Sequence, residues 1–216
     1  WLLSLFWAGS LVAVAAVYWW PARLGPKTGL LFSAAGTALL ALMGSWAMVL
    51  LGAALFGMGY GVIAAVYNPR VLAAYGPRGP AMMSLLNAIF TVGAIAAPRV
   101  FLALDQNPVT VFWLITGFTA AILAAALAIG DTRSAGPAGG DAPVRIDWLV
   151  LAFAALGIGI EASFVGLGPT ALILAGESQE RAARLLSSFF ITYLVARGSL
   201  VFLAHRLPAF PIYAGA

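Results

Sequence analysis

The chain has 216 residues, of which 63% are apolar and only 8% charged, and it contains no cysteine. A soluble globular domain carries roughly 25% charged residues, so a water-soluble fold of this length could not hide so much apolar surface. This composition excludes a soluble domain, a disulfide framework and a thiolate metal site, and it indicates that a lipid bilayer is the solvent.

Apolar runs long enough to cross a bilayer, which takes about 20 helical residues, follow one another along the chain. Segments rich in proline, glycine and charge separate them. The first run lacks the basic start and cleavage site of a signal peptide, and the chain does not begin with methionine. We therefore expect a fragment of a longer protein with an all-α fold, a polytopic membrane helical bundle. The seven predicted spans lie near 2–20, 29–45, 47–67, 80–102, 108–130, 148–174 and 185–204.

The stretch from Gly52 to Arg99 predicts two apolar helices joined by a short basic turn. The first helix carries glycines at 57, 59 and 61 and is expected to break at Asn68-Pro69. Two prolines in the turn at 75–80 set the start of the next helix. Small residues let helices approach closely in lipid, so these glycines predict close helix packing.

Basic residues are distributed unevenly between the two sets of predicted loops. One set holds seven Lys and Arg residues, and the opposite set holds only Arg181 and Arg184. The excess of positive charge places the first set in the cytoplasm, so the chain starts outside and ends inside. The pI of about 9.9 is thereby explained without a nucleic-acid partner. The seven are Arg23, Lys27, Arg70, Arg78, Arg133, Arg145 and Arg206.

Two features suggest that the chain spans parts of two repeated units. Residues 131–147, DTRSAGPAGGDAPVRID, form the longest hydrophilic segment and predict a flexible linker and domain boundary. Ser4-Leu-Phe-Trp7 precedes Arg23-Leu24 by nineteen residues, and Ser187-Ser-Phe-Phe190 precedes Arg206-Leu207 by the same distance. The offset of 183 residues between the two matches is about the size of a six-span half, as in transporters with internal repeats.

The loop Trp20-Pro-Ala-Arg-Leu-Gly-Pro-Lys27 resembles a degraded form of the G-x-x-x-D-R-x-G-R-K loop of the major facilitator superfamily. Arg23, Gly25 and Lys27 fit this gating-loop motif, whereas Tyr18 and Ala22 stand where it has glycine and aspartate.

Within that superfamily, Gly57–Pro69 and Leu86–Ile95 resemble spans 4 and 5 of the fucose:proton symporter family. Glu161–Gly166 and Ser188–Arg197 resemble its spans 7 and 8. The resemblance implies a partial major facilitator fold, with spans 2 to 8 of twelve. Residues 1–130 would be an N-terminal six-helix half lacking its first span, 131–147 a cytoplasmic linker, and 148–216 the first two spans of the C-terminal half.

The function implied is that of a secondary active transporter moving a small neutral, sugar-like solute by alternating access. Its partners would be the solute, protons and the lipid bilayer of a multi-pass cell membrane protein, such as one of the bacterial inner membrane. It would be a monomer when full length, without a cofactor, and the fragment alone would not transport. Efflux of lipophilic compounds, and a non-transporting membrane protein that keeps the fold, are the alternatives.

One departure from the family bears on coupling. In the fucose permease, a span-4 glutamate four residues before the Asn of the Asn-Pro pair carries protons. Counting back from Asn68 gives Ala64 in this chain, which excludes proton coupling at that position.

Glu161 and Arg197 are the ionisable residues expected deepest inside spans. A charge at mid-depth costs about 2.5–3.5 kcal/mol on insertion scales, so it is paired or functional. Two interpretations remain open: a structural ion pair between consecutive spans, or a gate or coupling carboxylate that faces the transport cavity.

Four other residues are weaker candidates for substrate binding. Asn87 with Phe90 one turn on presents either an amide and an aromatic face to a solute or an interhelical hydrogen bond. Tyr60 lines a cavity or packs among glycines, and Asn68 marks a helix end. An enzyme is not expected: the only lysine lies in a loop, which excludes a retinal Schiff base, and the only histidine lies outside the spans.

Overall fold

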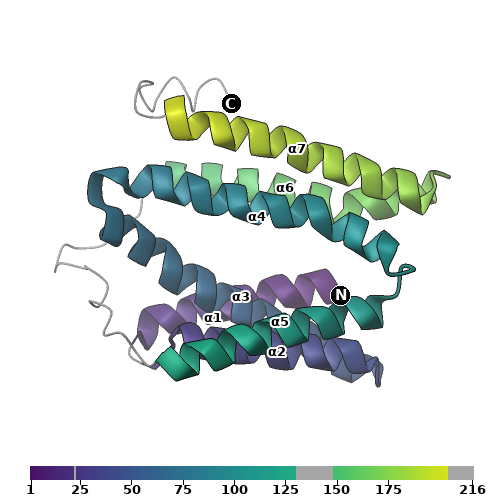
Figure 1. Cartoon of the computed structure of the whole chain (residues 1–216), viewed down its shortest axis with the longest axis horizontal. Helices are drawn as coiled ribbons and strands as arrows, with labels where there is room; N and C mark the ends of the chain where they lie inside the picture. Colours follow the sequence, from purple (N-terminus) through teal and green to yellow (C-terminus); the bar gives the residue numbers. More distant parts are fainter. Residues whose placement is uncertain (22, 130–147, 204–216) are drawn as a thin grey trace. The chain divides into compact units, whose positions relative to one another are not determined.

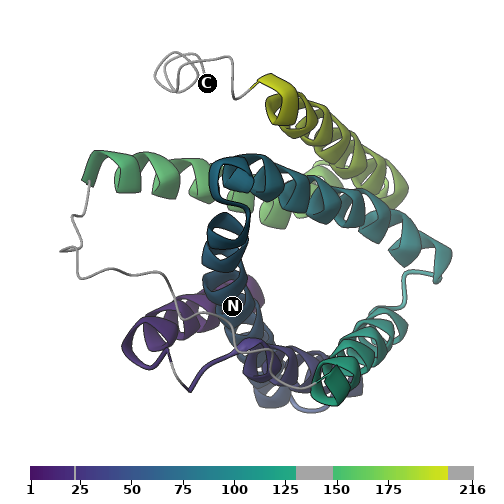
Figure 2. The same cartoon turned by 60° about the vertical axis from the view of Figure 1, so that its left-hand side comes forward.

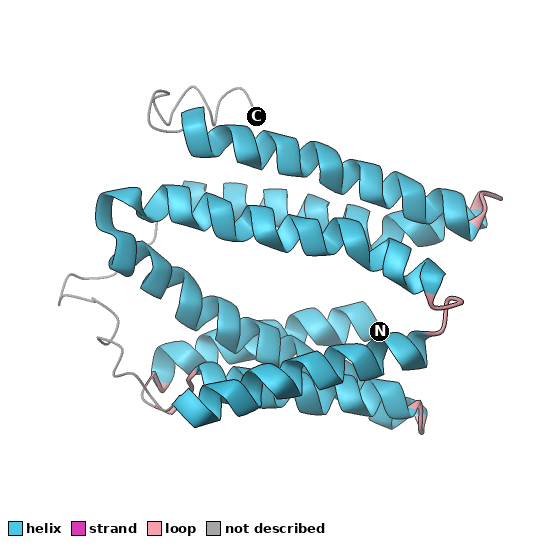
Figure 3. Ribbon diagram, viewed as in Figure 1, coloured by secondary structure: helices cyan, strands magenta, loops and turns pink. Residues whose placement is uncertain are grey.

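The computed structural model describes residues 1–21, 23–129 and 148–203. Within these ranges the chain forms seven α-helices and one short 3-10 helix, and it contains no β-strand (Figures 1 and 3). The all-α prediction is confirmed for this part of the chain, and each predicted span coincides with one helix. The elements are α1 (Leu2–Trp19), α2 (Pro26–Leu42), α3 (Trp46–Tyr75), η1 (Gly76–Arg78), α4 (Gly79–Ala103), α5 (Pro108–Ile129), α6 (Trp148–Leu174) and α7 (Gln179–Leu203).

The helix starts follow from local chemistry. Pro26 occupies the first position of α2, where its missing N–H costs nothing. The Ser45 hydroxyl accepts a hydrogen bond of 3.3 Å from the Met48 N–H at the start of α3. The Asn107 side chain accepts one of 3.0 Å from the Val109 N–H at the start of α5. These caps satisfy backbone donors that have no partner inside the helix.

The predicted break at Asn68-Pro69 is wrong, because α3 continues through Pro69 to Tyr75. A proline inside a helix lacks the N–H that would bind the carbonyl four residues back, and membrane helices tolerate such a loss. The helix ends instead at Gly76, whose positive φ of 47° terminates it before Pro77.

Three helical stretches of the described residues are long and apolar enough to cross a membrane: Leu2–Trp19, Trp46–Ala103 and Pro108–Ala128. The second of these contains both α3 and α4. Pro26–Leu42 and Ile158–Leu174 are apolar but shorter. Length and composition therefore support membrane helices, while seven separate crossings remain a prediction.

The helices fall into two compact units, one containing α1, α2, α3 and α5 and the other containing α4, α6 and α7. This grouping places α4 with α6 and α7, whereas the expected division at 131–147 places it with the helices before the linker; within its unit α4 packs against α7. The linker itself lies outside the described residues, as do Arg133, Arg145 and Arg206. The assignment of the chain to two transporter halves remains a prediction.

In the first unit α3 lies between α1 and α2, and α5 packs on α2 (Figure 2). A Cβ atom on Gly57 would overlap the backbone carbonyl of Phe6, and one on Gly61 would overlap that of Ser10. Gly57 lies beside Phe6 and Gly61 beside Ser10, so the residue numbers rise in the same direction along both helices, and α1 and α3 run parallel. Only glycine fits at these crossings, so the predicted close packing is confirmed.

A hydroxyl pair joins α2 and α5 in this unit. Thr116 of α5 and Thr37 of α2 form a hydrogen bond of 2.9 Å between their side-chain oxygens. Thr37 is fully buried and also lies within hydrogen-bonding distance, 2.9 Å, of the backbone carbonyl of Ser33, one turn earlier. Its polar group is therefore satisfied in the core.

In the second unit α7 contacts both α4 and α6 (Figure 1). The buried Ser187 of α7 donates a hydrogen bond of 3.3 Å to the carbonyl of Ile95 on α4. Pro98 interrupts the backbone bonding of α4 close to this carbonyl. A serine from a neighbouring helix thus supports the backbone beside a proline.

The exposed surface of both units is rich in large apolar side chains. Leu11 is 72% exposed, and Phe118 and Val195 are similarly open. Exposed tryptophans stand at helix ends, among them Trp19, Trp46 and Trp148. This is the surface expected of helices that contact lipid and place indole rings at its boundary.

Candidate functional site

A hydrogen-bonded chain of three polar side chains joins α6 and α7. The Tyr193 hydroxyl donates to the Glu161 carboxylate over 2.9 Å. The Arg197 guanidinium donates to the same phenolic oxygen and lies 4.4 Å from the centroid of the Tyr193 ring. All three residues are half-buried. Tyr193 therefore holds the carboxylate through its oxygen and the guanidinium through both its oxygen and its ring.

The direct ion pair that was one interpretation of Glu161 and Arg197 is not formed. Among the described residues, ion pairs join Glu177 to Arg181 and Glu180 to Arg184, and none joins Glu161 to Arg197. Glu161 and Arg197 instead both bond to the hydroxyl of Tyr193, a residue that was not among the candidates predicted from the sequence. Its position four residues before Arg197 was the available signal, because that spacing places two side chains on one helix face.

Aromatic packing fixes the orientation of the Tyr193 ring. The ring stacks on Phe189 one turn earlier, with centroids 6.0 Å apart and an interplanar angle of 23°. Phe190 meets it edge-on at 6.5 Å. Phe189 also contacts Phe164 of α6 at 5.1 Å. These contacts hold the hydroxyl toward Glu161, which lies near the middle of α6.

An apolar groove of about 1050 Å³ lies between α6 and α7, beside the three hydrogen-bonded side chains. Among the described residues of its lining, Ser163 carries the one side-chain hydroxyl. Phe164 and Phe189 belong both to the groove and to the aromatic packing that leads to Tyr193. The rings of Phe164 and Phe189 therefore connect the wall of the groove to Tyr193.

Asn87 and Phe90, both on α4, are not joined to this chain. The Asn87 amide donates over 2.9 Å to the carbonyl of Met83 on its own helix. Its backbone carbonyl accepts a bond of 2.7 Å from the buried Thr91 hydroxyl. Phe90 is 57% exposed. Of the two interpretations of Asn87, the interhelical hydrogen bond is not formed by its amide, which bonds within α4 instead.

Tyr60 and Asn68, both on α3, belong to the first unit. The Tyr60 ring lies 5.7 Å from that of Phe6 and 6.2 Å from that of Trp7. It therefore packs between α3 and α1, as one of its two interpretations expects. Asn68 is exposed within the helix and does not mark its end.

The three residues predicted to form a gating loop, Arg23, Gly25 and Lys27, lie just before and within the first turn of α2. The backbone N–H of Arg23 donates to the carbonyl of Trp20 over 3.0 Å, and Gly25 caps α2. Lys27 occupies the second position of the helix. Arg23 and Trp20 also line a cavity of about 310 Å³ within the first unit.

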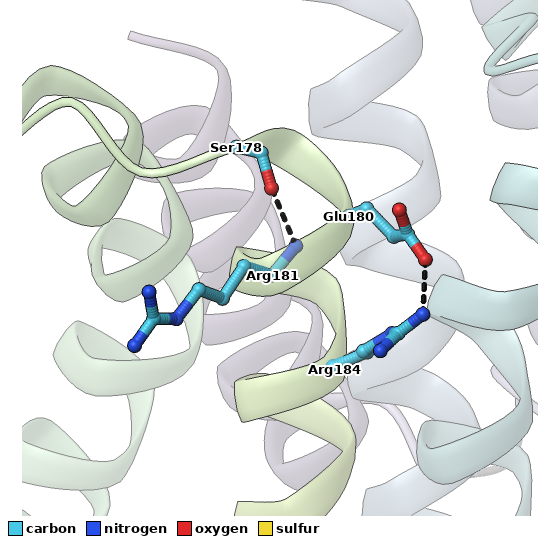
Figure 4. Close-up of polar contacts among 4 residues, drawn as sticks. All are labelled: Ser178, Glu180, Arg181 and Arg184. Carbon is cyan, nitrogen blue, oxygen red and sulfur yellow. Dashed lines mark hydrogen bonds and ion pairs between the residues drawn. The ribbon is translucent and has the colours of Figure 1, made fainter.

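The turn between α6 and α7 is charged but balanced (Figure 4). Ser178 caps α7 by accepting a bond of 3.1 Å from the Arg181 N–H, and Glu180 pairs with Arg184. Glu177 pairs with Arg181 at 3.2 Å. Arg181 and Arg184 are the two basic residues of the loops predicted to lie outside the cell. Each is paired with a glutamate, so this turn carries little net positive charge.

The polar chain offers three kinds of chemistry: a carboxylate that can take up a proton, a phenol that can donate and accept, and a permanent cation. Within the described ranges no group of three His, Cys, Asp or Glu residues could hold a metal ion. No protein-family model, curated protein or solved structure matches the chain.

Proposed function

We propose that the chain is part of a secondary active transporter of the major facilitator type, which moves a small neutral solute by alternating access. The observation that carries this proposal is the Glu161–Tyr193–Arg197 chain, which joins the middle of the apolar helix α6 to the half of α7 that follows its charged first two turns. Charged side chains in such surroundings are costly and mark solute or ion pathways. A purely structural link would not require a charge on either side of the tyrosine.

The helices of the described residues carry few charged side chains away from their ends, which supports a neutral solute. Glu161 is the only acid of α6, which makes it the candidate proton carrier. This role replaces the one lost at Ala64.

The test is uptake of radiolabelled L-fucose by liposomes that contain the full-length protein, under an imposed inward proton gradient. L-fucose is the probe because the sequence resembles the fucose:proton symporter family. We expect uptake above that of protein-free liposomes, and collapse of the gradient should reduce it. Uptake equal to the protein-free control would overturn the proposal for this sugar.

A second candidate function is efflux of lipophilic compounds, and the groove between α6 and α7 favours it. Its lining is almost wholly apolar, whereas a sugar needs hydrogen-bonding partners for its hydroxyl groups. Extrusion of rhodamine 6G from the same liposomes, with no uptake of L-fucose, would select this alternative. Transport of neither probe favours a membrane protein that keeps the fold without transporting.

A further inference from the structure

The hydrogen-bond chain has a direction, which is set by the protonation state of Glu161. A phenol carries one proton, so Tyr193 can donate to one partner only. Arg197 has donors and no acceptor, so it must donate to the phenolic oxygen. The Tyr193 proton is therefore donated to Glu161, whose Oε2 atom accepts it.

Protonation changes this assignment. A proton from the aqueous phase that binds Glu161 converts an acceptor into a hydroxyl group that needs an acceptor of its own. Tyr193 is the one hydrogen-bond partner of the Glu161 side chain in the described part of the chain. When the proton binds at the Oε2 atom of the half-buried Glu161, the acceptor beside the new O–H group is the phenolic oxygen of Tyr193.

We propose that protonation of Glu161 reverses the Glu161–Tyr193 hydrogen bond and turns the Tyr193 hydroxyl into a donor for an oxygen atom of the transported solute. This inference rests on the proposed function as a carrier. The phenolic oxygen then accepts from both Glu161 and Arg197, and its own proton is released from the bond to Glu161. Tyr193 is only half-buried, so its hydroxyl can reach a ligand.

The reversal specifies the solute and the order of binding. The solute must present a hydrogen-bond acceptor, such as a hydroxyl, ether or carbonyl oxygen, and it binds after the proton. Release follows in the opposite order, because loss of the proton from Glu161 makes the carboxylate compete again for the Tyr193 proton. The positioning residue Tyr193 thereby couples the two fluxes.

Few other charged groups face this chain from the helices packed around it. On α7 the charges of Glu180, Arg181 and Arg184 lie in the first two turns, where Glu180 pairs with Arg184 and Arg181 with Glu177. Helix α4, which packs on α7, carries Arg99, which is exposed and bonds to neither Glu161 nor Tyr193. Glu161 is thus the acidic group that bonds to Tyr193.

Exchange of radiolabelled L-fucose between the two sides of liposomes, without a gradient, tests the proposal across a range of pH. In the unaltered protein, exchange should fall as rising pH ionises Glu161. In Glu161→Gln the amide N–H donates to Tyr193 as the protonated acid does, so exchange should stay high and independent of pH. In Tyr193→Phe exchange should drop about tenfold at low pH, as expected for one lost hydrogen bond.

Tyr67→Phe is the matched control, since it removes the hydroxyl of an exposed tyrosine on α3. It should keep the pH profile of the unaltered protein. The proposal is overturned if Tyr193→Phe keeps that profile as well. Absence of exchange by the unaltered protein would instead count against the proposed transport of L-fucose.

Infrared difference spectra of the purified protein test the reversal without any solute. Lowering the pH should produce the carbonyl band of a protonated carboxyl group that is missing in Glu161→Gln. A tyrosine band should shift with it and be missing in Tyr193→Phe. A Glu161 band without a tyrosine shift would overturn the reversal, even if the protein transports nothing.

Discussion

Glu161 and Arg197 lie on either side of one phenolic oxygen, that of Tyr193, and do not form an ion pair with each other. A direct pair would lock two helices together with little room for change. The hydroxyl between the charges donates to Glu161 and accepts from Arg197, so a proton on Glu161 can change the link. This difference makes the three residues a candidate coupling site as well as a structural clamp.

A double-mutant cycle should show that the two charges interact through Tyr193. Removing either charge leaves the other without its compensating partner, so Glu161→Gln and Arg197→Gln should each lower the free energy of unfolding, by about 1–2 kcal/mol. The double variant should recover part of the loss. The measurement is the free energy of unfolding of each purified variant in denaturant, and strictly additive losses would show that the charges do not interact.

Gly57→Ala should destabilise the first unit. The new Cβ atom overlaps the Phe6 carbonyl, so α1 must move away from α3, at a cost of about 1–3 kcal/mol. Gly117→Ala on α5 is the control, because its Cβ would meet nothing within 4 Å. Thermal unfolding followed by circular dichroism compares them. Equal midpoints for the two variants would contradict the tight crossing.

Two adjacent serines on α7 should behave differently. Ser187 bonds across to Ile95 of α4, whereas Ser188 bonds only to the carbonyl of Arg184 on its own helix. Ser187→Ala should lower the unfolding free energy by about 0.6 kcal/mol, a typical value for an interhelical bond in a membrane, and Ser188→Ala should leave it nearly unchanged. Chemical unfolding of both variants provides the test, and the reverse order of stabilities would show that the Ser187 bond contributes nothing.

The absence of cysteine permits a direct test of orientation. Gln179→Cys places a thiol at the exposed start of α7, and Arg78→Cys places one in the exposed turn before α4. If the loop charges set the topology, a membrane-impermeant maleimide should label the first variant in intact cells and the second only after lysis. Labelling of both variants in intact cells would refute the prediction that these two loops lie on opposite sides of the membrane.

The helices were predictable because apolar runs end at proline, glycine and charge, as at Gly25-Pro26 and Asn107-Pro108. The continuation of α3 through Pro69 was not predictable from the sequence. A proline removes one backbone hydrogen bond, and the surrounding residues decide whether the helix ends there or continues. The packing glycines were also predictable, but which glycines contact a neighbour was not: Gly57 meets α1, whereas Gly93 meets nothing.

The candidate site was predictable in part. Glu161 and Arg197 stood out because charges are rare in apolar runs, whereas Tyr193 did not, because an uncharged aromatic side chain is ordinary in such a run. Its role depends on the register between α6 and α7, which places its hydroxyl opposite Glu161. The grouping of α4 with α7 depends likewise on tertiary contacts that no local pattern encodes.

The most direct test of the central claim is proton movement caused by the solute. L-fucose is added outside liposomes that contain the full-length protein, in weakly buffered medium and without an imposed proton gradient. The external pH is then recorded. The account predicts that the medium becomes more alkaline with the unaltered protein, because each solute enters with a proton bound at Glu161. Glu161→Gln should exchange L-fucose yet leave the external pH unchanged. The same alkalinisation with Glu161→Gln would contradict the account.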